Sequence, residues 1–185
     1  MSKKLAIVFP GAGYHCDKPL LYYAKKIAKN KDYEIIEANY DFREFVKNIK
    51  EDAEATQKAL EFGLERVTEQ LKDVDFSTYD RVVFIGKSIG TAIAAKYSKA
   101  FEVNAEQIVF TPIEVTFSYL NPCDGFVFHG TADPLCDTDM CVQLCKQMSL
   151  TYAVIPDANH SLETGDVLID LKNMERIMSI VDSLM

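Results

Sequence analysis

The chain has 185 residues, and 48% of them are hydrophobic, with eleven Phe and nine Tyr. This apolar content is enough for one large core, so we expect a single domain over residues 1–185. The net charge of −8 at pH 7 argues against nucleic acid and anionic membranes as partners, because both bind basic surfaces.

The N-terminal sequence MSKKLAIVFPG has only five apolar residues before Pro10, which is too short for the apolar part of a signal peptide. No segment approaches the apolar length of a transmembrane helix. The five cysteines are odd in number and form no recognisable disulfide framework. We therefore expect a cytoplasmic protein with reduced thiols and no membrane insertion.

Apolar runs and amphipathic segments alternate along the chain. Strands are predicted at 4–9, 33–40, 82–85, 107–110, 125–130 and 152–155. Apolar residues at helical spacing predict helices within 20–28, 53–71, 89–100, 140–148 and 167–184, the first capped by Asp17 and the fourth by Asp137. The last helix is expected to turn eight apolar residues inward: Val167, Leu168, Leu171, Met174, Ile177, Ile180, Val181 and Leu184.

This alternation predicts an α/β fold, with a parallel sheet covered by helices on both faces and joined by right-handed crossovers. Two segments carry no clear pattern. Residues 42–49 predict a turn or short helix, and residues 111–122 join two strands without helical spacing. Because ligands bind beyond the carboxyl ends of parallel strands, the loops that follow the strands are the candidate site.

The loop after the third predicted strand has the sequence GKSIG, which matches the pattern G-x-S-x-G around Ser88. A serine lifted above a sheet needs a sharp, strained turn between strand and helix. The glycines at 86 and 90 remove side chains where neighbouring backbone comes close. The turn also places the Ile89 backbone N–H at a helix N-terminus, where it can stabilise an oxyanion. The alternative interpretation is a tight turn with a helix-capping serine.

A nucleophilic serine needs a base and an orienting acid. His160 follows the last predicted strand and Asp133 follows the fifth, so each candidate lies in the loop after a different strand. Asp137 and Asp157 are the alternative acids, but Asp137 suits a helix cap and Asp157 would have to fold back to reach His160. The other histidines are His15, beside the predicted site, and His129, which we expect to be packed at a strand end.

The chain order Ser88, Asp133, His160 resembles the α/β-hydrolase family, as do FPGAG (9–13), GKSIG, HGTAD and DANH. The resemblance covers nearly all of the domain. It implies a serine hydrolase that cleaves acyl bonds of the carboxylesterase or thioesterase type through an acyl-enzyme, with Ser88 as nucleophile, His160 as base and Asp133 as acid. It further implies an oxyanion hole formed by the backbone N–H groups of Ala12 and Ile89. The expected substrate-lining residues are Gly11, Gly13, Tyr14, His15 and Lys87, with Lys87 solvated.

The chain also departs from that family. Two strands that precede the first one in the full fold are missing, which leaves a reduced, six-stranded, three-layer sandwich. The connection at 111–122 leaves room for only a minimal lid, so we expect an open cleft that takes small or flexible acyl substrates. The partner is then a small-molecule acyl compound with no cofactor, and the oligomeric state and natural substrate stay open.

Two other functions fit parts of the sequence. A non-catalytic binding protein could keep the same fold and the same three residues. A dinucleotide-binding protein would use Gly11 and Gly13 with Glu37 for the ribose, but Cys16 occupies the position of the third glycine.

A metal cluster of Cys136, Cys141 and Cys145 is a further alternative. Because Cys141 and Cys145 share a helical face with Met140, Leu144 and Met148, they are predicted to be small core residues. No histidine stands at ligand spacing beside them, so the sequence predicts no metal site.

Overall fold

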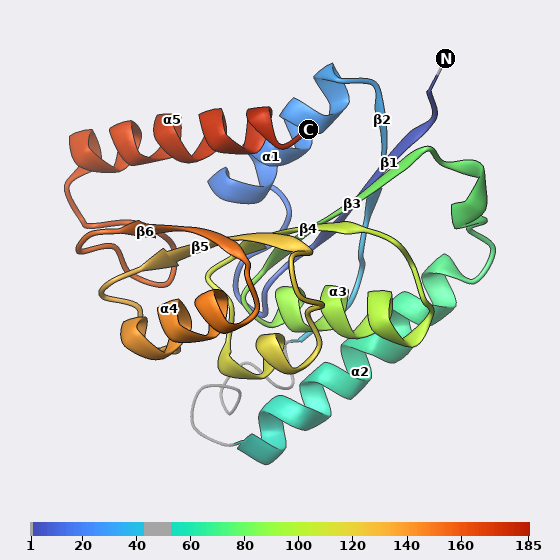
Figure 1. Cartoon of the computed structure of the whole chain (residues 1–185), viewed down its shortest axis with the longest axis horizontal. Coiled ribbons are helices and arrows are strands. Elements are labelled where there is room, and N and C mark those ends of the chain that lie inside the picture. The colour runs from blue at the N-terminus through green and yellow to red at the C-terminus, as the bar shows by residue number, and fades with distance from the viewer. Residues whose placement is uncertain (1, 43–52) are drawn as a thin grey trace.

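A six-stranded sheet, parallel throughout, forms the middle layer of the molecule (Figure 1). The structure is a computed structural model that describes residues 2–42 and 53–185. The strand order is β2-β1-β3-β4-β5-β6, which confirms the predicted reduced sheet. The strands are β1 (Lys4–Phe9), β2 (Tyr33–Glu37), β3 (Arg81–Lys87), β4 (Glu106–Phe110), β5 (Gly125–Gly130) and β6 (Thr151–Ile155).

Helices cover both faces of this sheet, as the alternating pattern predicts (Figure 1). One layer holds α1 and α5, and the opposite layer holds α2, α3 and α4. The helices are α1 (Pro19–Asn30), α2 (Ala53–Leu71), α3 (Ile89–Ala100), α4 (Thr138–Gln147) and α5 (Val167–Ser183). Short 3-10 helices lie at Phe76–Thr78 and Glu114–Ser118.

Side-chain alternation in the central strands builds a core on each face. In β3, Val83 and Ile85 pack in the α1/α5 core, whereas Val82 and Phe84 pack in the α2/α3 core. Strands buried on both faces read as continuous apolar runs, which is why VVFI carries no polar residue. Because side chains alternate between the two faces of a strand, each strand contributes residues to the core on both sides of the sheet.

The order of strands changes direction at β1, which lies between β2 and β3. The chain leaves β1 for β2 on one side and later returns to β3 on the other, so the loops after β1 and β3 diverge there. A crevice forms at such a switch point, beyond the carboxyl ends of the strands. This topology brings the loop that starts at Pro10 next to the turn at Ser88.

Two local predictions were wrong. β2 ends at Glu37 rather than at residue 40. Asp17 does not cap α1, because the N-cap residue is Lys18 and Pro19 occupies the first turn. The Tyr14 hydroxyl accepts the Leu20 backbone N–H at 3.0 Å instead. The turn or short helix predicted at 42–49 lies outside the described residues, apart from Phe42 itself.

The prediction for α5 was correct only for its second half. Ile177 and Val181 are fully buried, and Met174, Met178, Ile180 and Leu184 pack against the same core. The first turns are exposed, with 70% of Val167 and Leu168 and 62% of Leu171 accessible. Helical spacing identifies which residues share a face, but not how much of that face another element covers.

The connection at 111–122 lies against the α3 layer. It contains the 3-10 helix at Glu114–Ser118, whose Thr116 and Phe117 are buried. The Thr116 and Thr91 hydroxyls are 2.8 Å apart, which ties this connection to α3.

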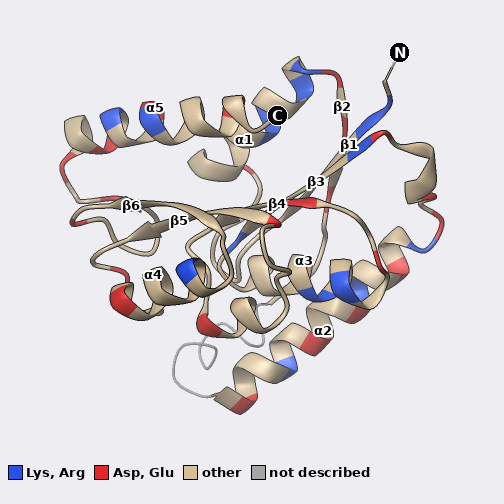
Figure 2. Ribbon diagram, viewed as in Figure 1, with Lys and Arg blue, Asp and Glu red and all other residues tan. Residues whose placement is uncertain are grey.

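Charged residues are interspersed along the elements rather than sorted by sign. Figure 2 shows both basic and acidic residues along α2. Within residues 2–42 and 53–185, no helix combines the length and the apolarity needed to cross a membrane.

Candidate active site

Ser88 occupies a strained turn between β3 and α3. Its φ is 56° and its ψ is −128°, a region that side-chain-bearing residues rarely adopt. The turn is held by the Ser88 N–H, which donates to the Phe110 carbonyl at 3.0 Å, and by the Thr91 N–H, which donates to the Ser88 carbonyl at 2.9 Å. The serine is half-buried at the rim of the sheet.

The two glycines around Ser88 are required by space. A Cβ at Gly86 would lie 2.7 Å from the Thr91 Cα, and a Cβ at Gly90 would overlap the carbonyl oxygens of Phe9 and Pro10. Real Cβ atoms do not approach backbone this closely, which confirms that glycine is needed at both positions to avoid a clash. The backbone of β1 and the first turn of α3 can therefore touch beneath the serine.

His160 connects Ser88 to Asp133. Its Nε2 is 2.8 Å from the Ser88 Oγ, and its Nδ1 is 2.8 Å from Oδ2 and 3.0 Å from Oδ1 of Asp133. The three residues come from the loops after β3, β5 and β6. The Asp133 side chain is fully buried, whereas 20% of the His160 side chain is exposed. Asp133, rather than Asp137 or Asp157, thus supplies the carboxylate beside this histidine.

The protonation state of the His160–Asp133 pair depends on whether the Asp133 carboxyl is ionised. Burial alone would raise the pKa of Asp133, but hydrogen bonding and charge attraction from His160, helped by the Leu135 N–H, lower it overall. An ionised carboxylate can only accept hydrogen bonds, so Nδ1 of His160 must be the donor. In the neutral ring Nε2 then carries a lone pair, which can accept the Ser88 hydroxyl proton.

Thr111 and Asn159 also position this histidine, although neither was predicted as a site residue from the sequence. The Thr111 hydroxyl donates to the His160 carbonyl at 3.0 Å, and Thr111 itself is fully buried with φ of 43°. The Asn159 side chain accepts the Ser161 N–H at 2.7 Å and so fixes the turn that follows His160. Thr111 directly follows β4, and the rule that sites lie after strands could have found it.

The loop after β1 forms a tight turn beside Ser88. Gly11 and Tyr14 exchange two backbone hydrogen bonds of 3.0 and 3.2 Å, which leaves Ala12 and Gly13 at the tip. A Cβ on Gly11 would lie 3.1 Å from the Ser88 Cβ, so this loop packs directly against the serine. Gly13 is exposed and has open space around it, so no neighbouring atom requires a glycine there.

Among the other predicted lining residues, Lys87 does not match its prediction. It was expected to be solvated but is only 1% exposed, and its Nζ lies 5.0 Å from the centre of the Tyr14 ring. The physical reason is that Lys87 continues β3 and shares the α1 face with Val83 and Ile85. Burial is also the main cause that raises the pKa of Tyr14 to about 12. His15 is exposed, and its Nδ1 accepts the Asp17 N–H at 3.3 Å.

The features weighed for a dinucleotide site are engaged in other contacts. The Glu37 carboxylate pairs with the Lys25 ammonium at 2.6 Å. Cys16 is buried, and burial is the main cause that raises the pKa of its thiol to about 12, with Glu37 adding to the shift.

A histidine lies near the cysteines in the fold, although none stands at ligand spacing beside them in the sequence. His129 is buried at the end of β5, as expected, but it lies beside Cys136 and Cys141. Burial lowers the pKa of His129, although Asp133 and Asp137 act in the opposite direction. Cys141 and Cys145 are buried on α4, which confirms them as core residues. Spacing along the chain missed the histidine because the sheet, not the helix, brings it there.

No protein-family model and no curated protein matches the chain. Solved structures do match it. An α/β serine hydrolase homologue from Coxiella burnetii is 14% identical with a TM-score of 0.67, over 100% of this chain and 86% of the other. A serine hydrolase without lid from Xanthomonas campestris is 15% identical with a TM-score of 0.60, over 99% and 81%. Est1E from Butyrivibrio proteoclasticus, with ferulic acid bound, is 12% identical with a TM-score of 0.69, over 100% and 88%.

These likenesses extend over nearly the whole chain at low identity, so they concern the arrangement of the backbone. They agree with the parallel six-stranded sheet and its two helical layers. The chain therefore has the α/β-hydrolase fold.

Proposed function

We propose that this protein is a serine hydrolase that cleaves acyl bonds, most readily carboxylic esters, through an acyl-enzyme intermediate. The observation that carries the proposal is the continuous hydrogen-bonded line from the Ser88 Oγ through His160 to Asp133. A hydroxyl, an imidazole and an ionised carboxylate in this order are the parts of a nucleophilic triad. Each distance lies within ordinary hydrogen-bond range.

In the first half of the reaction, the Ser88 Oγ attacks the carbonyl carbon while its proton passes to Nε2 of His160. The tetrahedral oxyanion then collapses, and the leaving alcohol takes that proton as it departs. In the second half, water attacks the acyl-enzyme, gives its proton to Nε2 and releases the acid, after which the serine is reprotonated. The buried Asp133 carboxylate stabilises the imidazolium in both halves.

The oxyanion is assigned to the backbone N–H groups of Ile89 and Ala12. Ile89 is the first residue of α3, and N–H groups in a first helical turn have no partner within the helix. Ala12 follows Gly11, which packs against Ser88, and its N–H is not used by the two bonds of the turn. Two such donors, already oriented, stabilise developing negative charge without reorganisation.

A small or flexible acyl group fits the proposed site. The β4–β5 connection, where a helical lid could stand, instead packs against α3 through Thr116. Ferulic acid bound to Est1E adds aromatic acids to the compounds worth testing. A panel of p-nitrophenyl esters of increasing chain length, with methyl ferulate and an acyl thioester, would rank these substrates.

The proposal is tested by labelling with a fluorophosphonate, followed by intact mass and peptide mapping. We expect one adduct, located on Ser88 and absent from Ser88→Ala. Ser161→Ala, which changes a serine beside His160, serves as the matched control and should label normally. Folded wild-type protein that does not label would instead indicate a non-catalytic binding protein. Stabilisation by NAD(P) in a thermal shift assay would favour the dinucleotide alternative.

A further inference from the structure

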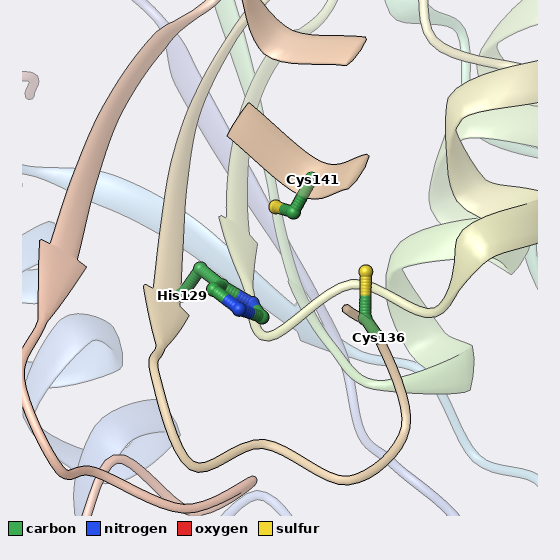
Figure 3. Close-up of side chains that lie close together, drawn as sticks. All are labelled: His129, Cys136 and Cys141. Atoms are coloured by element: carbon green, nitrogen blue, oxygen red, sulfur yellow. The ribbon is translucent and has the colours of Figure 1, made fainter. Parts of the chain in front are cut away.

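A buried cluster of one histidine and two cysteines lies where β5, the loop that follows it and the start of α4 meet. A ring nitrogen of His129 and the Sγ atoms of Cys136 and Cys141 all lie within 4.8 Å of one another (Figure 3). Their exposed fractions are 1%, 3% and 1%. Figure 3 shows that they come from three separate segments: the end of β5, the loop and the first turn of α4.

His129 has an unused ring nitrogen in this cluster. Its Nε2 is 2.9 Å from the Thr138 hydroxyl, whereas its Nδ1 is buried and has no hydrogen-bond partner. Among residues 2–42 and 53–185, no other buried side-chain nitrogen or oxygen lacks a partner. Leaving such an atom unsatisfied destabilises the folded protein, so an occupant that bonds to it would offset that cost.

We propose that His129, Cys136 and Cys141 form a binding site for a thiophilic divalent cation, Zn²⁺ in the first instance. Nitrogen and sulfur donors are the set that zinc prefers in proteins. Tetrahedral Zn–S bonds of about 2.3 Å put two sulfurs about 3.8 Å apart, so the donors need to approach by no more than about 1 Å. Rotations of the two cysteine side chains can supply this movement.

Charge balance favours a divalent ion in this buried place. Binding two thiols as thiolates releases two protons, and the two negative charges then cancel those of Zn²⁺. A site without net charge avoids the large cost of burying an unpaired ion. With Cu⁺ the same three donors would leave one negative charge.

Thr138 already provides the outer contact that such a histidine needs. Histidines that bind metal through one nitrogen usually donate the other N–H to a nearby acceptor, which fixes the ring and its tautomer. An Nε2–H that donates to the Thr138 hydroxyl leaves the Nδ1 lone pair free for a metal. Cys145 is buried one helical turn beyond Cys141, but its Sγ does not belong to the group of donor atoms within 4.8 Å of one another.

The proposed catalytic acid lies within the segment that the metal site would hold, because Asp133 is between His129 and Cys136 in the chain. A bound ion would join the end of β5 to α4 and so anchor both ends of this loop. The site is distinct from the line of Ser88, His160 and Asp133, whose donors already have partners. Its expected effect is therefore on stability, independent of any hydrolase activity.

The experiment uses full-length protein whose thiols are reduced with a phosphine and whose metals are removed by a chelator. Added Co²⁺ should produce thiolate charge-transfer bands in the near ultraviolet and the visible bands of a tetrahedral site. Zn²⁺ should remove these bands at one ion per chain and raise the melting temperature. We expect Thr138→Val to lower the affinity for the metal about 10–100-fold. The loss of affinity should be larger in Cys136→Ser and in Cys141→Ser. Cys123→Ser, at an exposed cysteine, is the matched control and should bind normally.

Folded, fully reduced wild-type protein without these bands at excess Co²⁺ would overturn the proposal, and this result depends on no variant. Binding that survives in both Cys136→Ser and Cys141→Ser would overturn it as well, because the ion would then lie elsewhere. Fluorophosphonate labelling of Ser88 is measured in parallel. The outcome of that labelling does not bear on the metal site, so the two proposals are tested separately.

Discussion

The Ala132 backbone N–H donates a 2.9 Å hydrogen bond to the Ala158 carbonyl, and this bond joins the loop of Asp133 to the loop of His160. Two further bonds support it. The Thr131 N–H donates to the Ile155 carbonyl at 3.0 Å, and the Asp157 N–H donates to the Thr131 hydroxyl at 2.7 Å. The carboxylate and the imidazole are therefore brought together by backbone pairing just beyond β5 and β6.

Gly130 makes this pairing possible, and Gly130→Ala should disrupt it. A Cβ at this position would overlap the Ala158 carbonyl oxygen, so the two loops would have to separate. We expect a loss of about 1–3 kcal/mol in the free energy of unfolding, measured by urea denaturation, together with slower labelling of Ser88. Gly13→Ala, which adds its methyl group to open space, should change neither quantity. Equal effects of the two substitutions would contradict this account.

Asp133→Asn tests the role of the carboxylate. The amide can donate a hydrogen bond to Nδ1 of His160 and so favour the tautomer whose proton is on Nε2. In that tautomer Nε2 cannot accept the Ser88 hydroxyl proton. We expect kcat for p-nitrophenyl acetate to fall about 10⁴-fold with little change in KM. Asp137→Asn keeps an amide oxygen for the α4 cap and serves as control, with near-normal kcat. A wild-type rate in Asp133→Asn would remove Asp133 from the mechanism.

The lowered pKa of Asp133 also predicts how stability depends on pH. A carboxyl whose pKa is lower in the folded state stabilises the protein above its unfolded pKa of about 3.9, and this contribution disappears as pH falls through the folded value. The stability difference between wild type and Asp133→Asn should thus shrink as the pH falls below about 4. Urea denaturation at several pH values in this range measures it. A difference that grows as the pH falls below about 4 would have the wrong sign.

Thr111 is proposed as a positioning residue for His160. Thr111→Val keeps the shape but removes the hydroxyl that donates to the His160 carbonyl. We expect a loss of about 0.5–1.5 kcal/mol in stability and a lower kcat with KM unchanged. Thr111→Ser, which restores the hydroxyl, should recover kcat. If serine and valine behave alike, the hydrogen bond does not position the histidine.

Local sequence was enough to predict three features of the molecule. These are the order of strands along the chain, the helix boundaries near Ser88 and the positions of the three triad candidates. GKSIG marks a strand-to-helix turn by its own residues, and α3 runs over the predicted residues 89–100. The site is then implied by the rule that loops after parallel strands meet at one edge. The two glycines at 86 and 90 follow from the same local reasoning.

Features that depend on contacts between distant segments could not be predicted in this way. His129 is seven residues from Cys136 and twelve from Cys141, and only the packing of α4 on β5 brings them together. The bond from Thr111 to His160 likewise depends on how two loops meet. Lys87 is different, because its alternation with Val83 and Ile85 already implied a buried side chain.

The two halves of α5 should respond very differently to substitution. Leu168 is 70% exposed, so Leu168→Gln should change the free energy of unfolding by less than about 0.5 kcal/mol. Ile177 is fully buried in the α1/α5 core, so Ile177→Ala should cost about 2–5 kcal/mol through lost burial and a cavity. Both residues lie on the same predicted apolar stripe, which makes them a matched pair for urea denaturation. A large loss in Leu168→Gln would mean that something covers the first turns of α5 in solution, since helix propensity alone differs little between leucine and glutamine.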